Sequence, residues 1–178
     1  MLEHHPNRPL SYFQRILVLI FHDSILSQIE VSGNTGAVQL LSYIDLDGMK
    51  TINDTLGHKK GDEALVEASQ ILKEVFRESD IIARVGGDEF AVLVLETKTV
   101  SAKLIAERLE HHIDLHNAAE HRDYKISMSI GIVDYNFKTP LSLDEWLSEA
   151  DECMYEQKRI KKVRNATIPL NKKPVGQI

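Results

Sequence analysis

The segment 81–95 reads IIARVGGDEFAVLVL, in which two strand-like runs, Ile81–Val85 and Glu89–Leu95, flank a pair of glycines. Short runs rich in β-branched residues are typical of strands, and glycines supply the positive φ that tight hairpin turns need. The segment therefore predicts an antiparallel hairpin whose turn presents Asp88 and Glu89 at its tip.

A second acidic position follows a short apolar run. Residues Ala37–Ile44 lie between turn residues and Asp45, which suits a buried strand with Asp45 at its exit. Because adjacent antiparallel strands bring the end of one beside the start of the next, we expect Asp45 and Asp88 at one edge of a sheet. Carboxylate oxygens without nearby cysteine or histidine clusters favour Mg²⁺ over Zn²⁺. The competing interpretation is two ordinary surface aspartates in turns, and the pair alone does not decide between them.

The segment that begins at Asp45 also looks like the start of a calcium-binding EF-hand loop, but its spacing is wrong. The sixth position is Lys50, where the loop needs glycine for its sharp turn, and the twelfth is Leu56, where it needs a bidentate glutamate. We therefore exclude an EF-hand.

Periodic apolar residues place the remaining elements around these strands. Helices are predicted over 9–29, 62–76, 100–119 and 143–158, and a further strand over 126–133. Residues after Asn165 are a candidate for a last strand and a linker.

The composition limits the classes of protein to which the chain can belong. Its 178 residues with 43% hydrophobic content support one core. The net charge of -6 argues against a general binder of nucleic-acid polymers, which needs a cationic face. The single cysteine, Cys153, fits a reducing compartment, and no apolar run reaches the roughly 20 residues that span a bilayer. We expect a cytoplasmic protein, or the cytoplasmic domain of a larger receptor whose membrane segments lie elsewhere.

Four spaced blocks of the sequence resemble the GGDEF domain family. They are 45–54 (DLDGMKTIND) with Gly57-His58 and Gly61-Asp62, 86–90 (GGDEF), 127–131 (SMSIG), and Ala150-Asp151 with Met154-Tyr155. The resemblance implies an α/β fold with α+β character, of the nucleotide-cyclase type. A mostly antiparallel five-stranded sheet flanked by helices is expected, in the order β-α-α-β-β-α-β-α-β after an N-terminal helix. It also implies a single GGDEF domain over 9–170, between an N-terminal tail of 1–8, which includes a candidate cloning remnant, and a C-terminal tail or linker of 171–178.

By this resemblance, the chain is a diguanylate cyclase that condenses two GTP into cyclic di-GMP and releases pyrophosphate. Asp45 and Asp88 resemble the family's Mg²⁺ ligands, with the backbone carbonyl of Leu46 as a third oxygen and Mn²⁺ as the alternative ion. Asp88 also resembles the acceptor of the attacking hydroxyl's proton, and Glu89 or the metal would share that work because a metal-bound carboxylate is a weak base. Lys50 matches the lysine that steadies phosphate charge in the transition state. Since one domain offers one GTP site, a homodimer is implied.

The same resemblance assigns contacts to the base and the phosphates. Asn53 and Asp62 would recognise guanine, with His58 as a lesser contact. A carboxylate accepts from both N1–H and the 2-amino group of guanine, whereas adenine has an acceptor at N1. The alternative is a helix N-cap for Asp62 and a local turn bond for Asn53. Lys158 and Lys162, at the end of the last helix, would bind phosphate.

An Arg-x-x-Asp motif stands upstream of the glycine pair, at Arg77 and Asp80. This is the placement of the family's inhibitory site for its own product. Arginine pairs bidentately with phosphate and stacks on guanine, so inhibition by cyclic di-GMP is expected. The alternative is that Arg77 lies near a helix C-terminus, where the helix dipole favours a cation.

The chain departs from the family pattern at several positions. Met49 replaces a phenylalanine, Lys161 a glycine and Lys162 an arginine, and a turn that the family carries before its first helix is missing. Lysine keeps the charge of arginine and loses its bidentate fork. These departures leave open a second interpretation, a weak or inactive module that binds GTP or cyclic di-GMP and regulates a fused phosphodiesterase domain. A third, an α/β fold that uses its acidic residues structurally, is disfavoured by the four spaced blocks.

Overall fold

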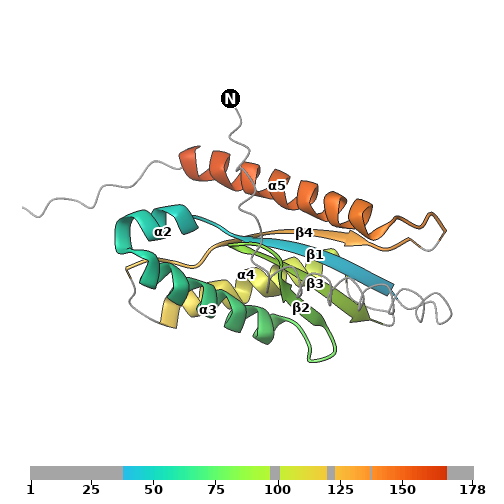
Figure 1. Ribbon diagram of the computed structural model, residues 1–178, viewed down its shortest axis with the longest axis horizontal. Coiled ribbons are helices and arrows are strands. Elements are labelled where there is room, and N and C mark those ends of the chain that lie inside the picture. Colours follow the sequence, from blue (N-terminus) through green and yellow to red (C-terminus); the bar gives the residue numbers. More distant parts are fainter. Residues whose placement is uncertain (1–37, 97–100, 120–122, 137, 168–178) are drawn as a thin grey trace, which may run out of the picture.

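The computed structural model describes residues 38–96, 101–119, 123–136 and 138–167 (Figure 1). The strands are β1 (Val38–Leu46), β2 (Ile81–Arg84), β3 (Glu89–Glu96) and β4 (Met128–Asp134). The helices are α2 (Met49–Leu56), α3 (His58–Val75), α4 (Ala102–Ala119) and α5 (Leu143–Thr167). Within the described residues, this order agrees with the expected one up to its last strand.

The four described strands form one antiparallel sheet in the order β2-β3-β1-β4. Because β1 lies between β3 and β4, Asp45 has Glu89 opposite it on one side and Ser129 on the other. The expected N-terminal helix over 9–29 lies outside the described residues, so it stays a prediction. The expectation of a strand directly after Asn165 is wrong for Ala166 and Thr167, which continue α5.

Helices cover both faces of the sheet, with α5 on one face and α3 and α4 on the other (Figure 1). Successive residues of a strand point to opposite faces. Leu40 and Ile44 of β1 join the core under α3 and α4, whereas Leu41 joins a smaller core under α5 that Trp146 fills. By the same alternation, Asp45 belongs to the α5 face.

A close approach between α5 and β4 occurs at Gly131. A Cβ at this position would lie 2.0 Å from the carbonyl oxygen of Ala150 and 2.3 Å from the amide nitrogen of Met154. Both distances are shorter than real Cβ contacts, so the helix backbone packs at this distance only on glycine. Ser127 and Ser129 alternate in phase with Gly131 and share its face. The SMSIG block therefore directs the hydroxyls of Ser127 and Ser129 toward α5 and, at Gly131, leaves room for the backbone of the helix.

Three of the element boundaries that differ from the predicted ones bear on the candidate site residues. Helix α3 begins at His58, earlier than predicted, because Gly57 adopts φ 85 and turns the chain directly out of α2. Asp62 thus lies inside the helix, and its interpretation as an N-cap is wrong. Helix α5 continues past Lys158 to Thr167, and strand β1 continues to Leu46, so that Asp45 lies within the strand. No helix among the described residues combines the length and the apolar content needed to cross a membrane.

Candidate functional site

Acidic side chains from the end of β1 and from the β2–β3 turn meet a lysine of α5 at the edge of the sheet where these strand ends lie. We call this place the acidic edge. Asp45 is the cross-strand partner of Glu89, and the amide of Leu46 donates to the carbonyl oxygen of Asp88 at 2.9 Å. The Nζ of Lys158 donates to Oδ1 of Asp45 at 2.5 Å. Folding therefore brings together three segments that are far apart in the sequence.

The lysine does not fully offset the cost of burying these acids. Asp45 is only 6% exposed. Burial raises the pKa of Asp45 above its ordinary value, and the hydrogen bond and charge of Lys158 lower it only in part. Burial lowers the pKa of Lys158, but the hydrogen bond and charge of Asp45 outweigh it, so that this pKa is raised. A simple ion pair would lower the aspartate's pKa, whereas here burial dominates and the pKa is raised.

Glu89 shares this environment and has a partner in Tyr43. Burial, followed by the charges of Asp45 and Asp88, raises the pKa of Glu89, whereas a hydrogen bond with Tyr43 opposes that rise. Burial and the charge of Glu89 also raise the pKa of the Tyr43 phenol. The sequence reasoning missed Tyr43, although strand alternation gives a signal, since it lies two positions before Asp45 and shares its face.

The turn that presents these acids is held by Arg84, another residue that the sequence reasoning missed. Its guanidinium donates to the carbonyl oxygen of Gly87, from Nε at 3.2 Å and from Nη2 at 2.5 Å. The side chain of Glu89 lies over Gly86, where a Cβ would be 2.1 Å from Oε2. A side chain at Gly86 would therefore require the Glu89 side chain to move from its present position.

The donors at this edge suit a hard divalent cation. Asp45 and Asp88 offer carboxylate oxygens, and the backbone of Leu46 offers a carbonyl, the ligand chemistry that Mg²⁺ prefers. No group of three or more His, Cys, Asp or Glu side chains in the described part of the chain is arranged to hold a metal. The predicted set has only two side-chain ligands and falls below that number. Asp45 is buried and lies close to the charges of Asp88 and Asp47, so a bound cation would offset buried negative charge.

The residues predicted to recognise guanine lie where α2 meets α3. The side chain of Asn53 packs against Gly61, where a Cβ would lie 2.0 Å from Oδ1 of Asn53. Asp62 follows Gly61 directly, and both Asp62 and His58 are exposed. The structure therefore brings Asn53 close to the helical turn that carries Asp62.

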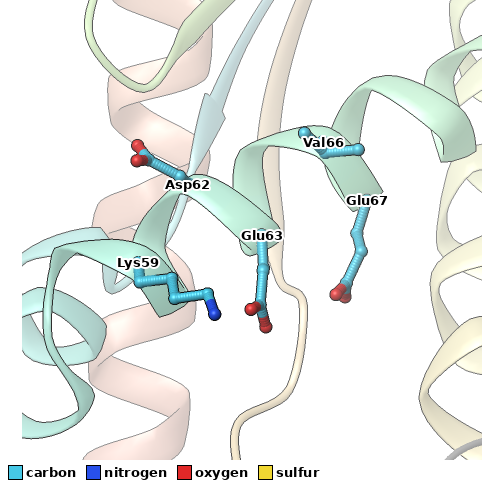
Figure 2. A pocket seen from close by; sticks show the side chains of 5 residues that line it. All are labelled: Lys59, Asp62, Glu63, Val66 and Glu67. Carbon is cyan, nitrogen blue, oxygen red and sulfur yellow. The ribbon is translucent and has the colours of Figure 1, made fainter.

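A hollow of about 330 Å³ opens on the flank of α3 (Figure 2). It is lined by Lys59, Asp62, Glu63, Val66 and Glu67. In Figure 2, Asp62 points away from the carboxylates of Glu63 and Glu67. The hollow shares only Asp62 with the predicted site, so we place the site at the acidic edge, where charged groups from three segments converge.

The other predicted residues lie around this edge or away from it. Lys50 is exposed on α2, which begins just after β1 ends, and Lys162 is exposed on α5. Arg77 is exposed just beyond the last residue of α3. The carboxylate of Asp80 accepts from the amide of Arg77 at 2.9 Å and from the amide of Leu95 at 3.1 Å. Asp80 thus closes the α3–β2 turn against β3.

The sequence pattern named "Diguanylate cyclase, GGDEF domain" matches residues 19–164. The chain belongs to the GGDEF family. This confirms the resemblance based on the four spaced blocks and the general architecture that it implied, a helix-flanked antiparallel sheet; a fifth strand is not among the described residues.

Several relatives are similar to this chain over part of their length. Diguanylate cyclase A of Treponema denticola is 34% identical over 135 residues, which cover 75% of this chain and 36% of that protein. Diguanylate cyclase DosC of Escherichia coli is 34% identical over 148 residues, which cover 82% of this chain and 31% of that protein. The uncharacterized protein YtrP of Bacillus subtilis is 36% identical over 121 residues, which cover 68% of this chain and 20% of that protein. The chain thus spans between 20% and 36% of the length of these three relatives.

Solved GGDEF domains have the same fold. The GGDEF domain of PA1120 (YfiN or TpbB) from Pseudomonas aeruginosa has a TM-score of 0.69 and 32% identity, over 80% of this chain and 89% of that one. The GGDEF domain of DgcB from Caulobacter crescentus, solved in complex with c-di-GMP, has a TM-score of 0.67 over 78% of this chain and 82% of that one. At 24% identity, the second likeness concerns the fold alone.

Proposed function

We propose that this GGDEF domain is a diguanylate cyclase that condenses two GTP molecules into cyclic di-GMP in a homodimer. The observation that carries the proposal is the convergence of Asp45, Asp88 and Glu89 with Lys158 at one sheet edge. Each phosphodiester bond forms when the 3′-hydroxyl of one GTP attacks the α-phosphate of the other and pyrophosphate leaves. Two such bonds close the ring, and a two-fold pair of domains supplies one site for each.

Asp45 and Asp88, with the carbonyl of Leu46, would hold the Mg²⁺ or Mn²⁺ ion. An ion held by these residues would supply positive charge that offsets the charge of the triphosphate. Asp45 is suited to this role because its carboxylate is buried beside Asp88, and its hydrogen bond with Lys158 is made through Oδ1.

The proton of the attacking hydroxyl needs an acceptor, and Asp88 and Glu89 are the acids at the turn. The raised pKa of Glu89 strengthens it as a base relative to an ordinary exposed carboxylate. Lys50, Lys158 and Lys162 supply positive charge to the phosphates, where fixed cations stabilise developing charge.

Selection of guanine is assigned to Asn53 and Asp62, with His58 as a lesser contact. The packing of Asn53 against Gly61 supports a joint role with Asp62, because it brings the two side chains to adjoining turns. A carboxylate that pairs with both donors of guanine would be left unpaired by adenine, which disfavours ATP.

Product inhibition is assigned to Arg77 and Asp80. Because the Asp80 carboxylate already accepts two backbone amides, Arg77 would provide most of the contact with cyclic di-GMP. We expect Arg77→Ala to shift the inhibition curve of cyclic di-GMP to higher concentration without changing the initial rate in its absence. An inhibition curve that does not move would contradict this role.

A second candidate function is a module that binds GTP or cyclic di-GMP without turnover. It is favoured by the departures at Lys161 and Lys162 from the glycine and arginine of the family pattern. It is also favoured by a relative named as a bifunctional diguanylate cyclase/cyclic di-GMP phosphodiesterase, MucR of Pseudomonas aeruginosa, which is 36% identical over 17% of its length. In such a protein, this domain would regulate a fused phosphodiesterase.

One experiment separates the two functions. The purified chain is incubated with GTP and Mg²⁺, and the products are resolved by mass. Cyclic di-GMP that falls by about 10² to 10⁴-fold in Asp88→Ala supports the cyclase. Asp114→Ala, at an exposed position on α4, is the matched control and should keep the rate of the unmodified chain. Tight GTP binding without any cyclic product would support the module instead.

A further inference from the structure

Two lysines on one face of α5 reach two carboxylates on one face of β1 and the turn that follows it. Lys158 donates to Asp45 at 2.5 Å, and the Nζ of Lys161 lies 3.7 Å from Oδ2 of Asp47. Lys161 also donates to the carbonyl oxygen of Met128, the first residue of β4. Residues three apart share a helix face, and residues two apart share a strand face. Two neighbouring points therefore fasten α5 to this end of the sheet.

Asp47 is a fixed acceptor because β4 holds it in place. Its Oδ2 accepts from the hydroxyl of Ser127 at 2.8 Å, and its Oδ1 accepts from the hydroxyl of Ser129 at 2.9 Å. Its backbone amide donates to the carbonyl of Ser127 at 2.8 Å. Since these contacts have already ordered the Asp47 carboxylate, pairing with Lys161 costs Asp47 little further conformational freedom.

The two lysine–aspartate contacts differ in what the proposed function demands of them. Lys158 must leave Asp45, or share it, when Lys158 binds the phosphates of GTP. The proposed function assigns no contact with GTP to Asp47 or Lys161, so their contact need not open when Lys158 leaves Asp45. Lys161 also stands where the family pattern has glycine, which has no side chain to make this contact.

We propose that Asp47 and Lys161 are positioning residues that hold the C-terminal half of α5 in register with β1 while Lys158 moves between Asp45 and the phosphates of GTP. This inference rests on the proposed function. In the part of α5 that follows Lys158, Lys161 contacts the first residue of β4 through its side chain. Without this side chain, the last turns of α5 fray and Lys158 is less well placed.

The test uses two variants at position 161 and one matched control. Lys161→Met removes the ammonium group and keeps an unbranched stem, and Lys161→Arg restores a cation. The control is Lys103→Met, because the Nζ of Lys103 lies 3.7 Å from Oε1 of Glu107 in an exposed pair on α4. We expect Lys161→Met to raise the KM for GTP about five- to tenfold with kcat changed less than about twofold, an effect within the reach of one charged hydrogen bond. Lys161→Arg should restore the KM, and Lys103→Met should leave it unchanged.

Hydrogen exchange of the α5 amides after Lys158, measured without nucleotide or divalent ion, gives a readout that does not depend on turnover. Lys161→Met should speed this exchange and Lys103→Met should not. In Asp47→Asn, adding Lys161→Met should speed the exchange by less than it does in the unmodified chain, because the contact with Asp47 is already weakened and only the hydrogen bond to Met128 is left to lose. Faster exchange with an unchanged KM would mean that the contact is only structural, and unchanged exchange would overturn the inference outright. If the unmodified chain makes no cyclic di-GMP, the proposed function fails, and the positioning role is then decided by the dissociation constant of GTP, with the same expected rise.

Discussion

Glu89 carries a carboxylate that folding makes harder to ionise. Burial raises its folded pKa above the ordinary value of 4.5. The folded chain therefore binds this proton more tightly than the unfolded chain, so the free energy of unfolding falls as pH rises from the ordinary pKa through the raised one. The stability that Glu89 provides is present below that window and lost above it. A carboxylate kept at this cost at the predicted site agrees with a functional rather than a stabilising role.

Glu89→Gln removes this ionisation. In the presence of EDTA, we expect the variant to unfold at a higher urea concentration than the unmodified chain near about pH 7, and the difference to disappear near about pH 4, where both carry a neutral side chain. Urea unfolding at the two pH values measures this, and the low-pH experiment is the internal control. A variant that is less stable near neutral pH would contradict the cost that we assign to the Glu89 carboxylate.

Asp62 is the residue whose substitution tests the selection of guanine over adenine. Asp62→Asn replaces one acceptor oxygen by a donor, so it loses the paired acceptance of both guanine donors. We expect the preference for GTP over ATP to fall by about 10²-fold, out of the roughly 10⁴-fold that polar pairing can give. The dissociation constants of the two nucleotides measure the ratio, and Asp114→Asn on α4 is the matched control. An unchanged ratio would assign base selection to other residues.

At the scale of elements, the packing of α5 on β4 depends on Gly131. Gly131→Ala introduces a Cβ that meets the backbone of Ala150 and Met154, which is rigid and cannot move aside as a side chain can. Overpacking of this kind costs about 1–3 kcal/mol, so the urea midpoint should fall accordingly. Gly87→Ala is the matched control for stability, since a Cβ there meets nothing within 4 Å. Equal losses of stability in both variants would contradict the close approach of α5.

The order of the elements and the hairpin followed from short-range patterns. Alternation of apolar residues and the glycine pair were enough to predict the β2–β3 turn and to place Asp45 and Asp88 at one edge. The start of α3 was missed because it depends on the positive φ of Gly57, whereas Asp62 has the residue type of an N-cap. The length of α5 was missed because its residues after Lys158 are mostly polar and exposed, so the apolar periodicity that predicted the helix ends before the helix does.

The same distinction holds within the site. Residue types and spacing pointed to the acids, and the resemblance to the family pointed to Lys50, Lys158 and Lys162, whose role in binding phosphate stays a prediction. The contact of Lys158 with Asp45 and that of Tyr43 with Glu89 depend on sheet register and on how α5 lies across the strands. No local pattern encodes that geometry, so these partners emerge only from the folded chain.

For the whole molecule, the proposed chemistry requires two chains, because each carries one acidic edge and cyclic di-GMP contains two new phosphodiester bonds. Asp88→Ala chains should therefore interfere with unmodified ones by forming mixed dimers that have one intact edge. With about a tenfold excess of Asp88→Ala, we expect the yield of cyclic di-GMP per unmodified chain to fall and a linear guanosine dinucleotide to accumulate, since one bond forms and the second does not. Mass analysis of the products measures both, and an equal mass of serum albumin controls for crowding. If the excess leaves the yield unchanged and no linear product appears, a single chain completes both bonds and the dimeric mechanism is wrong.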